Sequence, residues 1–233
     1  MNIEKNQEYI VEIIDNGYEG EGIAKIDGFT IFIPGAIKGE KIRILIVKVL
    51  SSHAFGKVLE ILEPSKSRKD PDCLTYKRCG GCNLRHIKYD ETLEMKQNAV
   101  QSLVNKTLTN KIEVQKTIGM ENPIHYRNKA QYPVGLDKDG NIVMGFFAGR
   151  THYIIDNTDC ALGAAINNKI LTIIKEYMKD NNITPYNEEK GNGTVRHILI
   201  RNGYHTNEIM VCVVINGKSL KNSEDLVNRL KVI

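Results

Sequence analysis

Four cysteines have the spacing that a metal cluster requires. Cys73, Cys79 and Cys82 form a C-x5-C-x2-C pattern, and Cys160 lies 78 residues beyond Cys82. The Gly-Gly pair between the second and third cysteine lets the backbone fold closely around a compact ligand. Three closely spaced thiolates with a distant fourth are typical of an iron–sulfur cluster, and the plant-type C-x4-C-x2-C pattern is similar. The spacing therefore favours a cluster held by these four side chains.

Two other interpretations of the cysteines remain open on spacing alone. Four thiolates also bind zinc, although structural zinc sites usually pair their ligands as two C-x2-C motifs and only one is present here. The absence of any metal is the third interpretation. The fifth cysteine, Cys212, lies in an apolar run over 209–215 and is predicted to be a buried, inert thiol. An odd number of cysteines fits poorly with a closed disulfide framework.

The segment before the cysteines is predicted to be a small β-barrel. Runs rich in Ile and Val cover 29–33, 41–49 and 55–62, and an earlier strand covers 10–14. Turn signals containing Gly, Asn, Asp or Pro separate these runs, with 20–22 among the turns. Short strands at this spacing indicate an OB-like barrel over residues 1–63.

Three further segments follow the barrel. Residues 64–90 are predicted to form the cysteine loop, and 91–112 a helical segment with Asp90 as the N-cap. Residues 113–233 alternate strands and helices, which indicates an α+β domain. Within it we expect a hairpin over 126–148, a helix over 164–179, strands over 195–201 and 208–215, and a last helix capped by Ser219 or Ser223.

The charge distribution is compatible with an anionic partner. Residues 1–63 carry a net charge of −3, whereas residues 64–111 carry +5. RNA is a partner consistent with this basic segment. The candidate RNA contacts combine cations with aromatic rings that can stack on bases, and they are Tyr126, Arg127, Lys129, Phe147 and Arg150. A solvated strand face explains the same residues equally well.

The sequence also limits where the protein works. The first ten residues do not have the pattern of a secretory leader, and no run of about 18 apolar residues occurs. We therefore expect a cytoplasmic protein without a membrane partner. No glycine-rich dinucleotide loop opens a helix anywhere in the chain.

Several motifs together resemble the RNA uracil-C5 methyltransferase family, which methylates uridine with S-adenosylmethionine. The resemblance covers nearly the whole chain. It rests on the cysteine pattern through His86, on 125–129 (HYRNK), on 145–150 (GFFAGR), on 152–162 around Cys160, and on 196–201 (RHILIR).

This resemblance implies a fold, two cofactors and a partner. Residues 1–63 are expected to be a TRAM barrel, and Cys73, Cys79, Cys82 and Cys160 the ligands of a [4Fe–4S] cluster. The partner is expected to be RNA, ribosomal RNA in preference to transfer RNA. Family members continue into a Rossmann-like catalytic domain with the S-adenosylmethionine site, a nucleophilic cysteine and a general base.

None of these catalytic motifs is recognisable in residues 1–233. The sequence therefore predicts an inactive front half that lacks the catalytic domain and contains no catalytic residue. Its helix over 91–107 is expected to pack on that domain and to leave Leu93, Val100 and Leu103 partly exposed.

Two functions from other classes compete with this interpretation. A self-contained nucleic-acid-binding module, with a structural zinc site held by the four cysteines, is the main alternative. An electron-transfer protein is the least favoured, because no flavin or dinucleotide motif accompanies the cysteines.

Overall fold

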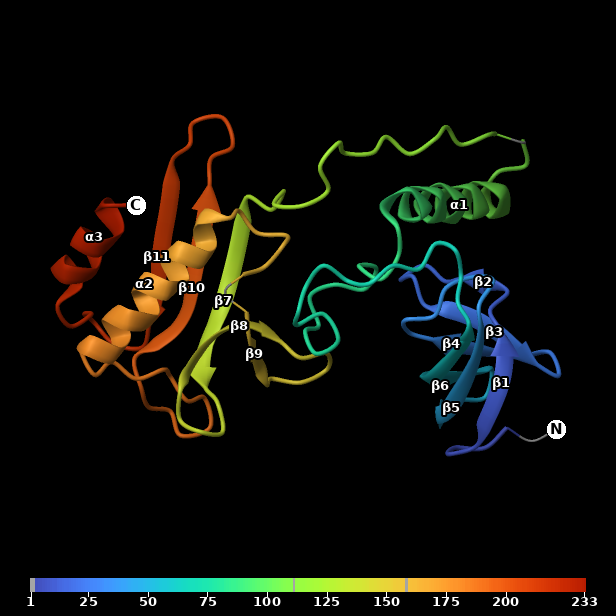
Figure 1. The fold of residues 1–233 in the computed structure, drawn as a ribbon, viewed down its shortest axis with the longest axis horizontal. Coiled ribbons are helices and arrows are strands. Elements are labelled where there is room, and N and C mark those ends of the chain that lie inside the picture. Colours follow the sequence, from blue (N-terminus) through green and yellow to red (C-terminus); the bar gives the residue numbers. More distant parts are fainter. Residues whose placement is uncertain (1–2, 111, 158) are drawn as a thin grey trace. The chain divides into compact units, whose positions relative to one another are not determined.

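A computed structural model describes residues 3–110, 112–157 and 159–233 (Figure 1). The chain divides into two compact units. Unit 1 consists of residues 1–71 and 82–121, and unit 2 consists of residues 72–81 and 122–233. Each unit is therefore built from two separate stretches of the sequence.

Unit 1 contains a six-stranded sheet in the order β1-β5-β6-β4-β3-β2. Its strands are β1 (Glu8–Glu12), β2 (Asp15–Asn16), β3 (Gly22–Ile26), β4 (Phe29–Ile33), β5 (Lys41–Val49) and β6 (His53–Glu63). All pairs are antiparallel except β4 with β6. The backbone amide of Ile14 donates to the carbonyl of Ile23 at 2.9 Å, which joins the end of β1 to β3 and curls the sheet on itself.

The core of this curled sheet is aliphatic. Alternate residues of each strand point inward because successive side chains of a strand face opposite sides. The inward side chains are almost completely buried, and they include Ile13, Ala24, Ile31, Ile33, Ile42, Ile44, Ile46 and Ala54. Strand β3 begins at Gly22, where the sequence predicted only a turn. A Cβ there would lie 2.6 Å from the Cβ of Ala36, so only glycine fits this inward position.

Helix α1 (Tyr89–Thr107) completes unit 1. It starts one residue before the predicted cap, with Lys88 at the N-cap position and Asp90 inside the first turn. Residues 112–120 run back along the helix (Figure 1). Gln101 fastens them, since its side-chain amide donates to the carbonyl of Ile112 at 2.9 Å and accepts from the amide of Val114 at 2.8 Å.

Unit 2 contains a five-stranded antiparallel sheet with two helices. The order β11-β10-β7-β8-β9 joins β7 (Lys129–Leu136), β8 (Ile142–Phe147), β9 (Ile154–Asp156), β10 (Val195–Asn202) and β11 (Ile209–Ile215). Helix α2 (Ile166–Asp180) lies across one face, and α3 (Ser223–Lys231) contacts α2 (Figure 1). The N-cap of α3 is Asn222, and neither predicted serine caps it with a side-chain hydrogen bond.

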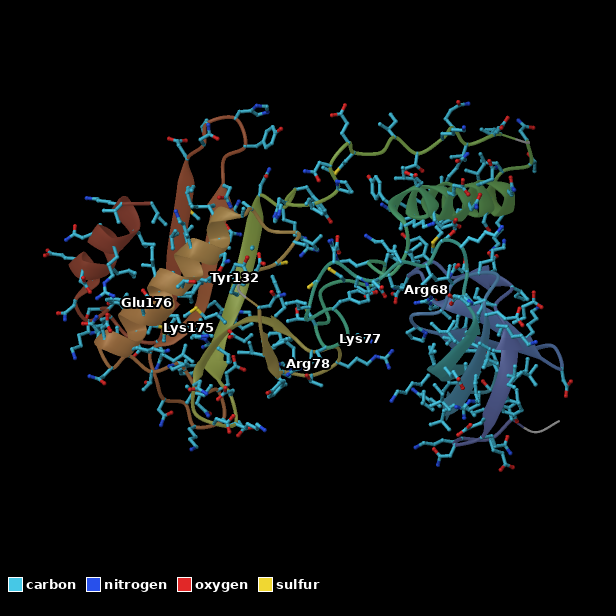
Figure 2. All side chains as sticks on the ribbon, viewed as in Figure 1. Arg68, Lys77, Arg78, Tyr132, Lys175 and Glu176 are labelled. Carbon is cyan, nitrogen blue, oxygen red and sulfur yellow. The ribbon has the colours of Figure 1, made fainter. Side chains whose placement is uncertain are left out.

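The two faces of this sheet differ. On the face toward α2, Tyr132 and Ile198 pack with Ile170 and Ile174 of the helix in one core; Figure 2 marks Tyr132 on β7. On the other face most alternate residues of β7 and β10 remain wholly or partly accessible, as at Gln131 and Leu199, whereas Pro133 is buried. Strands β7 and β10 therefore bury one face and leave most of the other accessible, whereas the first four residues of β8 are buried on both faces.

Cys212 lies on the open face, which corrects its predicted burial. Its neighbours Val211 and Val213 pack against the core, so alternation along β11 turns Cys212 outward, and its side chain is exposed. Of the described helices, none combines the length and the apolar character that crossing a bilayer requires.

Candidate functional site

Within the predicted segment 64–90, residues 72–81 belong to unit 2 and form a compact turn, to which the name cysteine loop refers from here on. The amide of Tyr76 donates to the carbonyl of Cys73 at 3.1 Å, and the amide of Cys79 donates to the carbonyl of Thr75 at 2.8 Å. The loop also presents the exposed cations Lys77 and Arg78 (Figure 2). These local bonds place two of the predicted ligands on one short piece of backbone.

Two long-range contacts hold the loop against the rest of unit 2. The amide of Gly80 donates to the carbonyl of Phe147 at 2.9 Å, beside a β-bridge between Cys79 and Ala148. The buried side chain of Asn157 donates to the hydroxyl of Thr75 at 2.8 Å. The loop is thereby fixed to the end of β8 and to the segment that follows β9.

Three of the four predicted cysteine ligands come together in unit 2. Burial raises the pKa of the Cys79 thiol, the nearby Cys160 and Cys73 thiols raise it further, and the Gly81 amide and Arg127 counteract these effects. The three thiols therefore lie close enough to influence one another electrostatically. Cys82 begins the second stretch of unit 1 and belongs to the other compact unit.

The donor set is chemically suited to a cluster, because it consists of sulfur ligands that are all partly buried. Among residues 3–110, 112–157 and 159–233, however, no three His, Cys, Asp or Glu side chains are arranged as metal ligands. Cys73, Cys79 and Cys160 thus lie near one another, but within these residues they are not arranged to coordinate a metal.

The predicted RNA contacts all lie in unit 2. Tyr126 and Arg127 precede β7, Lys129 begins it, Phe147 ends β8, and Arg150 lies in the turn after β8 with a φ of 62°. All five side chains are exposed. Arg127 is tied by its backbone, since its amide donates to the carbonyl of Leu162 at 2.9 Å. Arg127 also lies near Cys79, so the basic and sulfur groups share one region.

Sequence reasoning missed a groove of about 620 Å³ in unit 2. Its lining comes from β7, from the β8–β9 connection, from 185–189 and from β10. It includes Phe147, His152, Tyr153, Tyr186, Glu188, Arg196 and His197. These residues are far apart in the chain, and only the folded sheet brings them together. Three parts of its lining, Phe147, residues 152–154 and the 196–197 pair, lie in motifs of the family resemblance, and these motifs were the signal of the groove in the sequence.

A second missed feature is an aromatic cluster on the outside of the unit 1 barrel. The rings of Phe32, His53 and Phe55 lie within 6.1 Å of one another, centroid to centroid. Their strand neighbours Ile31 and Ala54 point into the core, so the three rings face outward. None of the three rings belongs to the barrel core. We call the group of Phe32, His53 and Phe55 the barrel aromatic cluster.

Comparison with known proteins identifies one domain. Residues 4–59 match the TRAM domain family, which confirms the predicted TRAM barrel. An uncharacterized RNA methyltransferase of Clostridium acetobutylicum is 42% identical over 231 residues, which are 98% of this chain and 50% of that protein. A protein of Halalkalibacterium halodurans with the same description is 39% identical over 229 residues, again 98% of this chain and 50% of that protein.

A solved structure shares the fold. It is the Pyrococcus abyssi tRNA (uracil-54, C5)-methyltransferase in complex with S-adenosyl-L-homocysteine, with a TM-score of 0.69 and 21% identity. The likeness covers 93% of this chain and 48% of that one.

These matches correct two predictions, namely that the chain is a front half defined by an absent Rossmann-like catalytic domain and that it is therefore inactive. Similarity to proteins named RNA methyltransferases extends over 98% of this chain, and the fold likeness to a solved methyltransferase over 93%. Both predictions relied on the lack of recognisable catalytic motifs, and that lack does not measure activity. The chain spans about half the length of the curated relatives that it matches, and it resembles them along nearly all of its own length.

Proposed function

We propose that this protein is an RNA methyltransferase that transfers a methyl group from S-adenosylmethionine to C5 of uracil. The observation that carries the proposal is the 42% identity, over 98% of the chain, to a protein named as an RNA methyltransferase. The fold likeness to a tRNA (uracil-54, C5)-methyltransferase supports the choice of uracil C5. S-adenosylmethionine supplies an electrophilic methyl group to this reaction.

The barrel aromatic cluster supports RNA as the substrate. Proteins that bind single strands combine aromatic rings, on which bases stack, with cations that follow the phosphates. Lys25 is on β3, beside the β4 strand that carries Phe32, and Lys48 of β5 is the direct partner of Phe55. Both lysines are exposed. The cluster thus has a cation on each side, although residues 1–63 as a whole are acidic.

RNA binding by the barrel is testable with two variants. A Phe32→Ala/Phe55→Ala double variant should bind a labelled single-stranded RNA at least tenfold more weakly, because stacking contributes about 1–3 kcal/mol per base. Tyr18, which is 84% exposed and lies outside the cluster, supplies the control variant Tyr18→Ala. Equal affinities for the double variant and the control contradict a role for the cluster.

We also propose that Cys73, Cys79, Cys82 and Cys160 hold a [4Fe–4S] cluster. The proximity of three of these thiols supports it, together with the rigid attachment of the cysteine loop to β8. Anaerobic purification should yield about four irons and four sulfides per chain. Cys160→Ser should lose them, whereas Cys212→Ser, which changes an exposed thiol on β11, should retain them. About one zinc without iron contradicts the cluster.

Methyl transfer itself is tested with radiolabelled S-adenosylmethionine. The expected product is 5-methyluridine in nuclease digests of ribosomal RNA or transfer RNA, each taken from cells that lack the protein. We predicted ribosomal RNA as the preferred substrate, and parallel assays of the two RNA pools decide between them. Label in another nucleoside contradicts the assignment to uracil C5.

A further inference from the structure

The groove of unit 2 has the size of a ligand site. Its volume of about 620 Å³ lies within the range of small-molecule sites, about 300–1,000 Å³. Of its lining residues, Val134 alone also belongs to the core that α2 and α3 help to build. All of its lining residues belong to unit 2.

One part of the lining is a preorganised cation. The guanidinium carbon of Arg196 lies 4.5 Å from the centroid of the Tyr186 ring, within the range of a cation–π contact. The Arg196 side chain also donates to the carboxylate of Glu188 at 2.8 Å. These two contacts orient the guanidinium plane, so that little side-chain entropy remains to be lost when a ligand binds.

A second part of the lining consists of aromatic rings that are not part of the hydrophobic core. The rings of Phe147 and His152 are 5.5 Å apart at an interplanar angle of 61°. Phe147 and Tyr153 are 39% and 47% exposed, although both are large side chains suited to burial. The carbonyl of Phe147 accepts from Gly80, so the cysteine loop fixes this wall of the groove.

The polar groups of the groove match a base and a ribose better than a phosphate. Arg196 is the single Lys or Arg among the residues that line it, and Glu188 and Glu189 accompany it. Carboxylates repel a phosphate, but they accept hydrogen bonds from base N–H groups and from a ribose 2′-hydroxyl. Burial, and then the Arg196 charge, lower the pKa of His197, so its neutral ring both donates and accepts.

Two exposed cations lie elsewhere on the same face. Arg201 and Lys129 are register partners on β10 and β7, and both are exposed. Arg201 is four residues along β10 from His197, or about 13 Å at about 3.3 Å per residue. A single strand that has one base in the groove reaches these cations with its neighbouring phosphates.

From this arrangement we propose that the groove binds one unpaired nucleobase together with its ribose. The base stacks on the rings of the lining, and Arg196, His197 and Glu188 contact its edge and the 2′-hydroxyl. The inference rests on the proposed function only for the source of this nucleotide, which is the RNA substrate. The bound nucleotide is distinct from any bases stacked on the barrel aromatic cluster, which belongs to unit 1.

The first test uses uridine itself, so that it does not depend on methyl transfer. Millimolar uridine added to the isotope-labelled full chain should shift the backbone NMR signals of Tyr186, Arg196 and His197. Ribose 5-phosphate at the same concentration should leave them unchanged. Uridine that shifts none of these signals overturns the proposal, and so does ribose 5-phosphate that reproduces the uridine shifts.

The second test uses matched variants and a labelled single-stranded RNA. Tyr186→Leu and Phe147→Leu keep apolar bulk but remove the ring face, and each should weaken binding about tenfold. Tyr204→Leu is the control, because Tyr204 also forms an edge contact with a histidine, His205, but lies outside the groove. Groove variants that bind RNA as tightly as this control overturn the proposal.

These outcomes separate the inference from the proposed function. If the protein transfers no methyl group while uridine still shifts the groove signals, the proposed function fails and the groove assignment stands. If methyl transfer is observed and uridine shifts nothing, the groove assignment fails alone.

Discussion

Arg68 and Glu40 form a two-pronged ion pair inside unit 1. The Nε and Nη2 atoms of Arg68 donate to the two carboxylate oxygens of Glu40 at 2.5 and 2.8 Å. Glu40 is completely buried, and its carboxylate also accepts from the amides of Ile37 and Ser65. The pair fastens the segment after β6 to the barrel.

Loss of the cation should therefore destabilise unit 1 strongly. Arg68→Met leaves a buried carboxylate without its charge partner, which costs about 3–5 kcal/mol of unfolding free energy. Arg43→Met is the control, because Arg43 pairs with Glu8 and Glu60 on an exposed surface and such pairs contribute about 1 kcal/mol or less. Urea unfolding measures both losses. Similar losses in the two variants contradict the ion pair's importance.

Acid should destabilise unit 1 through His86. Burial, and then the neighbouring Arg68 charge, lower the pKa of this histidine to about 4. A folded-state pKa below the unfolded value near 6.5 means that the stabilisation is complete above about pH 6.5 and is lost as the pH falls toward 4. The loss is on the order of 3 kcal/mol. Burial raises the pKa of Glu40, but hydrogen bonds from Arg68 and from the backbone lower it more, so the net pKa is lowered. Because its charged form is the stabilised one, protonation of Glu40 in acid also destabilises unit 1.

Unfolding free energies measured from pH 7 to pH 4 check this dependence. A His86→Gln variant should show a shallower decline than the wild type. His205→Gln, at an exposed position in the turn between β10 and β11, should leave the slope unchanged. Parallel slopes for His86→Gln and the wild type contradict the assignment.

Gly80 and Gly81 should respond differently to alanine. A Cβ on Gly80 would lie 2.9 Å from the Gly149 backbone, closer than side chains tolerate, whereas a Cβ on Gly81 would meet only the Cys79 sulfur at 3.4 Å. Gly80→Ala should therefore displace the cysteine loop from β8 and cost about 1–3 kcal/mol, as overpacking does. Gly81→Ala should be nearly neutral. Thermal unfolding measures both, and equal melting temperatures contradict the packing argument.

The hydroxyl of Tyr132 should contribute to unit 2 through a buried chain of hydrogen bonds. It accepts from the side-chain amide of Asn167 at 3.2 Å, and the oxygen of that amide accepts from Asn202 at 3.2 Å. Tyr132→Phe leaves a buried donor unpaired and should cost about 1–3 kcal/mol. Tyr204→Phe, at an exposed ring, should cost almost nothing. Equal unfolding midpoints contradict this role.

Local patterns in the sequence were sufficient to predict most helices and strands of both units. Runs rich in Ile and Val revealed β4, β5 and β6, and the apolar stripe of 166–177 revealed α2. Strand β3 was missed because its first residue, Gly22, signals a turn, and the inward packing of Gly22 against Ala36 depends on the distant connection between β4 and β5. Cys212 was misplaced because an unbroken apolar run does not show which of its residues face the core.

The sites were harder to predict than the elements. Cys73, Cys79 and Cys82 were visible because close spacing is itself the signal. The groove was not visible, since Phe147, Tyr186 and Arg196 become neighbours only through the strand order of unit 2. Long-range pairing of this kind has no local signature in a single sequence.

The interleaving of the two units sets the order in which the protein matures on the ribosome. Synthesis of the barrel strands ends at Glu63, but unit 1 also needs the residues up to 121. The cysteine loop leaves the exit tunnel long before β8, which carries its docking partner Phe147. The nascent chain must therefore keep the loop undocked while the 66 residues between Gly80 and Phe147 are added. Oxidation of its thiols during translation is the hazard that this delay creates.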